Sequence, residues 1–192
     1  MRVRADILGT QVDCLVGAPG AHIAQNVVGA LAAVALADGD VLNAAAALKD
    51  FTPLKGRGAR FAAGGVQVID ESYNANPASM AAALALLGAA TGGRRIAVLG
   101  DMLEMGDGAG AHHAGLAGPI AANRVDLVFA CGAETKALWD VLPAKRRGAY
   151  AKTSALLAPQ LMAALQPGDT VLVKGSNGAR MAVIVDALRA KV

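Results

Sequence analysis

The fold is decided by the stretch VQVIDESYNANPASM at residues 66–80. It begins with a short apolar run, continues through a polar segment and ends in an alanine-rich run, an order that predicts a buried strand, a loop and a helix. Asn76 suits the N-cap of that helix, and Pro77 suits its first position, where the missing N–H costs little. A loop at the carboxyl end of a strand, facing a helix N-terminus, is where open α/β sheets bind phosphorylated ligands.

The same alternation continues to the end of the chain. Apolar runs predict strands at residues 66–70, 95–99, 125–130, 148–151 and 170–174. The segments that follow them predict helices at residues 77–90, 110–123, 133–142, 154–165 and 179–190. Pro159 is expected to kink or restart the fourth of these helices. Continuous apolar strands separated by helices favour a parallel sheet covered on both faces. We therefore predict a Rossmann-like, doubly wound α/β domain with a mostly parallel sheet over residues 54–192.

The first 53 residues have a different organisation. They predict two strands at 2–7 and 11–16 and two helices at 22–37 and 41–49. Two strands and two helices bury too little surface to form a stable domain alone. Residues 1–53 are therefore interpreted as the remnant of a preceding domain. Residues 54–60, LKGRGAR, have the glycine-rich composition of a linker.

Composition excludes several classes of protein. With 55% hydrophobic and 17% charged residues among 192, disorder is not expected. Only 3% of residues are aromatic and the net charge is +3, which argues against a nucleic-acid platform. The longest apolar run, 27–37, is shorter than the roughly 20 residues that span a bilayer, and the first residues do not form a signal peptide, so a cytoplasmic location without membrane insertion is expected. Cys14 and Cys131 are expected to be buried thiols in a reducing compartment, and no metal site is predicted.

Several polar residues at the predicted strand ends have both a functional and a structural interpretation. Asp70 could accept hydrogen bonds from a ribose or cap its own turn, and Asn76 could line a site or serve only as an N-cap. The segment KGSNG at 174–178 could hold an anion through Lys174 and its flexible backbone, or it could be an ordinary loop. Arg57 could grip phosphate oxygens or be an exposed linker residue.

Other residues offer weaker signals. His22 and Asn26 lie four apart at a predicted helix start and share one face, where they could bind a ligand or be satisfied structural polar groups. His112 and His113 are expected to face solvent or to be hydrogen-bonded rather than to bind metal. The segment GDGAG at 106–110 lacks the spacing of a dinucleotide-binding turn, and no GxxxxGK[ST] motif occurs in the chain.

Read together, these segments resemble the Mur ligases of peptidoglycan synthesis, and within that family the branch that adds D-Ala-D-Ala. The matching segments occur in the same order as in the family. From the N-terminus they are GAH at 20–22 with Asn26, FTP at 51–53 with Gly56 and Arg57, DESYNANP at 70–77 with Ser79 and Met80, LGDM at 99–102 with Glu104 and Gly106, and VKGS at 173–176. The loop at 70–77 is the most specific part of the resemblance.

The resemblance implies a three-domain ligase. Residues 1–53 would be the last part of the central ATP-binding domain and 54–192 the complete C-terminal domain, while the UDP-binding domain, the P-loop and the Mg²⁺ ligands would lie in a missing upstream part. The implied activity is ATP-dependent amide formation between UDP-MurNAc-tripeptide and D-Ala-D-Ala, in cell-wall biogenesis that supports cell shape and division. This chain alone would be inactive. The alternatives are a non-catalytic Rossmann-like nucleotide-binding module and a sister ligase such as folylpolyglutamate synthase.

The resemblance also assigns roles to individual residues. It implies ATP contacts for His22, Asn26, Arg57, Asp70 and Asn74, with Arg57 also catalytic because it would reach the phosphates. It implies substrate contacts for Tyr73, Asn76, Lys174 and Ser176, the last two holding the incoming dipeptide.

Overall fold

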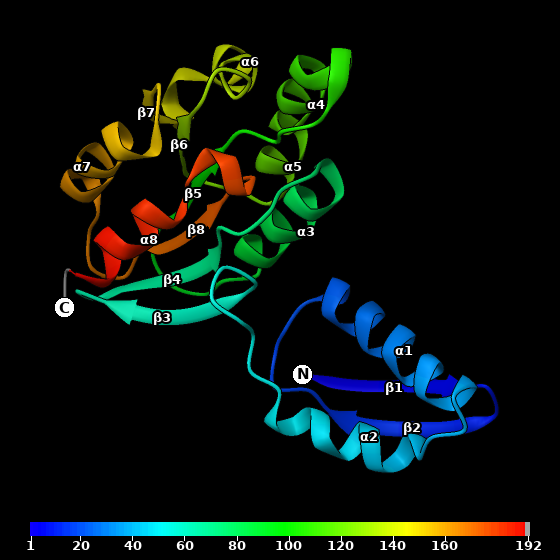
Figure 1. Cartoon of the computed structure of the whole chain (residues 1–192). Helices are drawn as coiled ribbons and strands as arrows, with labels where there is room; N and C mark the ends of the chain where they lie inside the picture. Colours follow the sequence, from blue (N-terminus) through cyan, green and yellow to red (C-terminus); the bar gives the residue numbers. More distant parts are fainter. Residues whose placement is uncertain (191–192) are drawn as a thin grey trace. The chain divides into compact units, whose positions relative to one another are not determined.

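The computed structural model describes residues 1–190, apart from the side chain of His22. The chain forms two compact units, Met1–Pro53 and Leu54–Val192. Each unit is described by itself, and Figure 1 gives the element labels used for both. Among the described residues, no helix is long and apolar enough to cross a bilayer.

The first unit is a hairpin covered by helices. Strands β1 (Arg2–Ile7) and β2 (Thr10–Leu15) pair antiparallel around a turn at Leu8 and Gly9, both with positive φ. Helix α1 (Ala21–Leu36), helix α2 (Val41–Ala47) and the 3₁₀ turn η1 (Leu48–Asp50) follow, as the sequence predicts within a few residues. The Asp40 side chain caps α2 by accepting the Asn43 N–H at 2.9 Å. Apolar residues of all four main elements share one core.

The second unit contains a six-stranded sheet in the order β3-β4-β8-β5-β6-β7. The five predicted strands are β4 (Val66–Glu71), β5 (Arg95–Gly100), β6 (Leu127–Cys131), β7 (Arg147–Ala151) and β8 (Thr170–Lys174), and they run parallel. Strand β3 (Ala59–Ala63) pairs antiparallel with β4 and was not predicted. The Gly64-Gly65 turn between them, with both φ values positive, is a common hairpin connection. The predicted doubly wound, mostly parallel sheet is confirmed.

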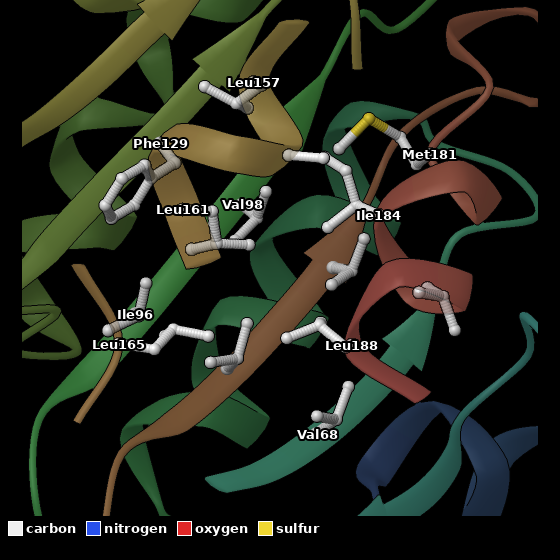
Figure 2. Packing of buried hydrophobic residues seen from close by; sticks show 14 of the residues in the cluster. Val68, Ile96, Val98, Phe129, Leu157, Leu161, Leu165, Met181, Ile184 and Leu188 are labelled. Carbon is white, nitrogen blue, oxygen red and sulfur yellow. The ribbon is translucent and has the colours of Figure 1, made fainter. Parts of the chain in front are cut away.

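Helices cover both faces of this sheet. On one face, α7 (Ser154–Ala164) and α8 (Ala182–Arg189) pack Leu157, Leu161, Ile184 and Leu188 against strand residues such as Phe129 (Figure 2). The other face is covered by α3 (Pro77–Gly88), α5 (Ala117–Ala122) and α6 (Lys136–Val141), which share a second core. Helix α4 (Ala109–Gly115) and the 3₁₀ turns η2 (Gly106–Gly108), η3 (Ala144–Arg146) and η4 (Asn177–Ala179) complete the unit.

Two helix predictions need correction. The predicted helix at 110–123 is two helices, α4 and α5, that meet at Leu116. Pro159 does not restart α7, which runs through it as one helix. Pro159 is exposed, so the carbonyl of Ala155, which loses its helical N–H partner, lies on the solvent side where water can hydrate it.

The topology concentrates loops at one edge of the sheet. The chain leaves β5 toward α4 and leaves β8 toward α8, and these helices belong to opposite faces although the two strands are neighbours. Ligands of open α/β sheets bind where connections diverge in this way, outside the carboxyl ends of the strands. We call the loops that follow the parallel strands, at residues 72–76, 101–103, 132–135, 152–154 and 175–180, the carboxyl edge.

Candidate functional site

Asp70 organises the first loop of the carboxyl edge. Its side chain is fully buried. Oδ1 accepts hydrogen bonds from the Ser72 N–H at 3.2 Å and the Ser72 hydroxyl at 2.6 Å, and Oδ2 accepts the Gly56 N–H at 3.0 Å. Both oxygens are therefore used inside the protein. Of the two interpretations of Asp70, this geometry favours the structural one, in which it holds Gly56 beside the loop.

Arg57 and Tyr73 form an exposed pair next to this contact. The Arg57 guanidinium carbon lies 4.0 Å from the centre of the Tyr73 ring, and the Tyr73 N–H donates to the Gly56 carbonyl at 3.1 Å. Gly56 has φ +76, and a Cβ there would lie 3.0 Å from that of Tyr73, so a larger residue would be strained and crowded at this position. A guanidinium stacked on a ring keeps its N–H groups available for an anion.

The two asparagines of this loop have local partners. Asn76 caps α3, because its side chain accepts the Ser79 N–H at 2.8 Å while Ser79 Oγ accepts the Asn76 N–H at 3.0 Å. The predicted N-cap is confirmed, and Pro77 is the first helical residue. The Asn74 side chain accepts the Ala75 N–H at 2.8 Å.

Lys174 connects β8 to the same loop. It is 2% exposed, its ammonium donates to the Asn74 carbonyl at 2.8 Å, and it lies 3.5 Å from a carboxylate oxygen of Glu71. Burial lowers the pKa of Lys174, and the Glu71 carboxylate partly opposes that shift. Lys174 is therefore a buried positive charge with one carboxylate beside it, in a pair that the parallel register of Glu71 and Lys174 sets.

Ser176 joins three loops. Its hydroxyl accepts the Leu103 N–H at 2.9 Å and donates to the Ala75 carbonyl at 3.4 Å, and its N–H donates to the Asp101 carbonyl at 2.9 Å. The side chain is buried. Ser176 thus fixes the relative positions of the segments after β4, β5 and β8.

Asp101 is a residue of this site that the sequence analysis did not single out. Its Oδ1 accepts hydrogen bonds from the Thr135 N–H at 2.8 Å and the Thr135 hydroxyl at 2.5 Å. It is only 9% exposed, and its Oδ2 accepts no hydrogen bond from the residues that the structure describes. An acidic residue at the carboxyl end of a buried strand, as at Asp70, was the available signal.

Asp101 lies in the wall of a pocket of about 370 Å³. The pocket opens between the ends of β6 and β7 and the start of α8, and its lining includes Asp101, Cys131, Gly132, Lys152, Ser154 and Arg180. Lys152 and Arg180 are exposed and form no ion pair within residues 1–190. Burial, with the Asp101 charge adding to it, raises the pKa of the Cys131 thiol to about 12, so this thiol is neutral at pH 7. The pocket offers a carboxylate oxygen and two cations to a small polar ligand.

The structure thus brings together seven of the nine predicted site residues. They lie in the connected loops of the second unit or at the strand ends next to them, and they are Arg57, Asp70, Tyr73, Asn74, Asn76, Lys174 and Ser176. Asn26 is exposed in α1 of the first unit, and His22 also lies in α1, but its side chain is outside the described part of the chain. In that described part, no group of three His, Cys, Asp or Glu could hold a metal ion.

The family follows from a comparison with known proteins. The model of the family described as "Mur ligase, glutamate ligase domain" matches residues 56–177. This chain belongs to the Mur ligase family. The match covers strands β3 to β8 and every loop of the carboxyl edge up to Asn177.

Individual relatives agree. The UDP-N-acetylmuramoyl-tripeptide--D-alanyl-D-alanine ligase of Escherichia coli is 36% identical over 182 residues, which cover 93% of this chain and 39% of that protein. The enzyme of the same name from Rickettsia prowazekii is 32% identical over 86% of this chain and 37% of its own length. This chain thus spans less than two fifths of these relatives.

Solved structures show the same fold. A MurF structure from Acinetobacter baumannii superposes with a TM-score of 0.82 at 26% identity, over 94% of this chain and 40% of that one. A Thermotoga maritima MurF ligase in complex with ADP gives a TM-score of 0.82 over 99% of this chain and 43% of that one, and at 20% identity it supports the fold alone.

Proposed function

We propose that this chain is the C-terminal portion of an ATP-dependent ligase that joins D-Ala-D-Ala to UDP-MurNAc-tripeptide during peptidoglycan precursor synthesis in the cytoplasm. The observation that carries the proposal is the carboxyl edge with its neighbours. Asp101 has a carboxylate oxygen without a partner among the described residues, Arg57 stacks on Tyr73 of the first loop, and the buried Lys174 at the end of β8 bonds to Asn74 of that loop. Relatives with that activity in their names, at 32% and 36% identity, support the choice of substrates.

The two units would have separate roles in that enzyme. Residues 1–53 would complete a central ATP-binding domain, in which His22 and Asn26 border the nucleotide. Residues 54–192 would form the C-terminal domain that brings Arg57 to the phosphates. The chain contains no GxxxxGK[ST] motif, so we expect it to be inactive without a partner region that supplies one. Mg²⁺ would accompany ATP, and the described residues offer no cluster of ligands to hold it.

The proposed reaction has two steps. The terminal carboxylate of the tripeptide attacks the γ-phosphorus of ATP, which gives an acyl phosphate and ADP. The amine of D-Ala-D-Ala then attacks the acyl carbon, the new C–N bond forms, phosphate leaves and the amine loses a proton. Negative charge develops on oxygens in both steps, and fixed cations lower its cost. The exposed Arg57 guanidinium fits this role, and Asp70 would support it through Gly56 because both its oxygens are already occupied.

The acceptor dipeptide would bind in the pocket beside Asp101. A zwitterion needs an acceptor for its ammonium and cations for its carboxylate, and Asp101, Lys152 and Arg180 supply these. Tyr73 and Asn76 would line the approach to the nucleotide, with Asn74 at the nucleotide itself. Lys174 and Ser176 would hold the loops around the dipeptide in place, since both side chains are buried in contacts with those loops.

A hybrid enzyme tests the proposal. This chain would replace the matching C-terminal region of the Escherichia coli relative, and phosphate release would be measured with ATP, Mg²⁺, UDP-MurNAc-tripeptide and D-Ala-D-Ala. We expect release that depends on D-Ala-D-Ala from the hybrid and none from the 192-residue chain alone. Release that depends on glutamate instead would favour a folylpolyglutamate-type ligase, and a well-folded hybrid without any acceptor-dependent release would favour a binding module.

A further inference from the structure

His113 is a buried titratable residue that the proposed reaction does not use. It lies in α4 and is 0% exposed. Its Nε2 is 2.8 Å from the Met102 nitrogen, and its Nδ1 is 2.7 Å from the Ala109 carbonyl oxygen. The neighbouring His112 is exposed, and its imidazole forms no hydrogen bond with the described residues.

These two contacts determine the protonation state of the imidazole. A backbone N–H can only donate, so Nε2 must present its lone pair to Met102. A carbonyl oxygen can only accept, so Nδ1 must carry the proton. In this arrangement His113 is neutral and is the Nδ1–H tautomer, because an imidazolium would face the Met102 N–H with a second N–H.

Met102 is the middle residue of the loop that shapes the site. Before it, Asp101 accepts two hydrogen bonds from Thr135 and presents its other carboxylate oxygen to the pocket. After it, Leu103 donates to Ser176. The three successive residues 101–103 therefore each form a hydrogen bond to a different part of the unit. These parts are α4, the segment before α6 and the loop after β8. His113 supplies the contact from α4.

We infer that His113 is a positioning residue: its neutral Nδ1–H imidazole accepts the Met102 N–H and holds residues 101–103 so that Asp101 faces the pocket. The pocket's ligand rests on the proposed function, whereas the tautomer and the hydrogen bond do not. Met102 N–H is buried, so a residue at position 113 without an acceptor leaves a donor unpaired and frees the loop to rearrange.

Nuclear magnetic resonance on the ¹⁵N-labelled 192-residue chain tests the inference. At neutral pH, long-range ¹H–¹⁵N correlations of the imidazole should show a protonated Nδ1 and an unprotonated Nε2. In H113A the Met102 amide should exchange with solvent roughly tenfold faster or more, since a lost hydrogen bond of this kind is equivalent to about that factor. H113Q, which can place an amide oxygen near the position of Nε2, should restore most of the protection, and H112A should leave it unchanged.

The functional consequence is measured in the hybrid enzyme. H113A should raise the KM for D-Ala-D-Ala several-fold with a smaller change in kcat, and H113Q should restore it in part. An Nε2–H tautomer or an imidazolium at neutral pH would overturn the inference, as would a folded H113A chain with unchanged Met102 exchange. The tautomer measurement decides the point if H113A does not fold. An inactive hybrid together with the expected tautomer and exchange would count against the proposed function alone.

Discussion

The two edges of the sheet in the second unit both contain a buried ion pair, but only the carboxyl edge also has a buried carboxylate with an oxygen that no described residue bonds. At the amino edge, Arg94 and Asp169 form a closed pair, with Nε and Nη2 of Arg94 at 2.9 and 2.7 Å from the two carboxylate oxygens. At the carboxyl edge, Asp101 keeps one oxygen without a partner among the described residues. Next to this edge, Arg57 stacks on Tyr73 and its N–H groups bond to no described residue. The difference indicates which edge stabilises the fold and which can accept a ligand.

The remaining contacts of the amino edge support this distinction. Asp169 is 2% exposed and also accepts the Gln166 N–H at 2.8 Å, while Arg94 donates to the Ala164 carbonyl at 2.9 Å. Burial acts to raise the pKa of Asp169, but the hydrogen bonds from Arg94 and Gln166 outweigh it, and the net shift is downward. A carboxylate satisfied in this way stabilises the loops around it and has little capacity for a ligand.

The largest effect is expected at Arg57. In the hybrid enzyme, R57A should reduce kcat by roughly 10²- to 10³-fold, because it removes a cation proposed to face the developing phosphate charge. R57K should recover only part of this loss, since an ammonium lacks the planar set of donors. R60A, at an exposed arginine of β3, is the matched control and should stay near the parent value. A fully active R57A hybrid would remove Arg57 from the mechanism.

At the amino edge, the expected effect is on stability. D169N should reduce the free energy of unfolding by about 3 kcal/mol at pH 7, because it breaks a largely buried ion pair. Urea unfolding followed by the fluorescence of Trp139, the only tryptophan of the chain, measures this. D140N, at the exposed Lys136–Asp140 pair, should change it by less than about 1 kcal/mol. Equal effects of D169N and D140N would show that the Arg94–Asp169 pair stabilises the fold no more than an exposed ion pair does.

The pH dependence of the same variant has a defined sign. The pKa of Asp169 is lower in the folded state than the usual 3.8, so the folded state binds its proton less tightly than the unfolded state does. Its stabilisation is therefore present above pH 3.8 and is lost as the pH falls through the folded-state pKa. The stability difference between the parent and D169N should shrink as the pH is lowered from 7 toward 3. A difference that grows over that range would be inconsistent with the shift.

Gly132 tests how tightly the carboxyl edge is packed. It has φ +113, and a Cβ there would lie 2.3 Å from the Asp101 carboxylate. G132A should therefore destabilise the second unit by about 2 kcal/mol and displace Asp101 from the pocket wall. G118A in α5, where the same construction meets nothing within 4 Å, should be neutral or slightly stabilising. A G132A protein as stable as the parent would show that the contact relaxes without cost.

The smallest of these effects is expected at Ser176. S176A removes the acceptor of the Leu103 N–H and should cost about 1 kcal/mol, with faster amide exchange at Leu103. Unchanged exchange at Leu103 would show that Ser176 does not hold the loop after β5. Exchange at Thr170 in β8, whose N–H donates to the Arg94 carbonyl, should be unaffected and serves as the control at the amino edge.

Local patterns in the sequence predicted the parts of the fold that depend on local chemistry. The Asn76 cap and Pro77 at the first position of α3 follow from residue preferences, and the apolar runs that form β4 to β8 follow from burial on both faces. Strand β3 was missed because its five residues include Arg60 and three alanines, which do not form the apolar run typical of a buried strand. Its strand conformation depends on pairing with β4, which the local sequence does not report.

The site was less predictable because its contacts join distant positions. The bonds of Asp101 with Thr135 span 34 residues, and the bond of Lys174 with Asn74 spans 100, so no spacing in the sequence reports them. The position of loops at the carboxyl edge could be predicted from the parallel sheet. Which side chains remain available there could not, because Asp70 and Ser176 are occupied by neighbours that only tertiary structure supplies.

A titration of the ¹⁵N-labelled chain with D-Ala-D-Ala, followed by nuclear magnetic resonance, tests most directly that the carboxyl edge is the ligand-binding edge. We expect chemical-shift changes that saturate at Asp101, Gly132 and Ser154, with none at Arg94, Gln166 or Asp169. Changes centred on the amino edge, or none at all at millimolar dipeptide, would contradict this expectation.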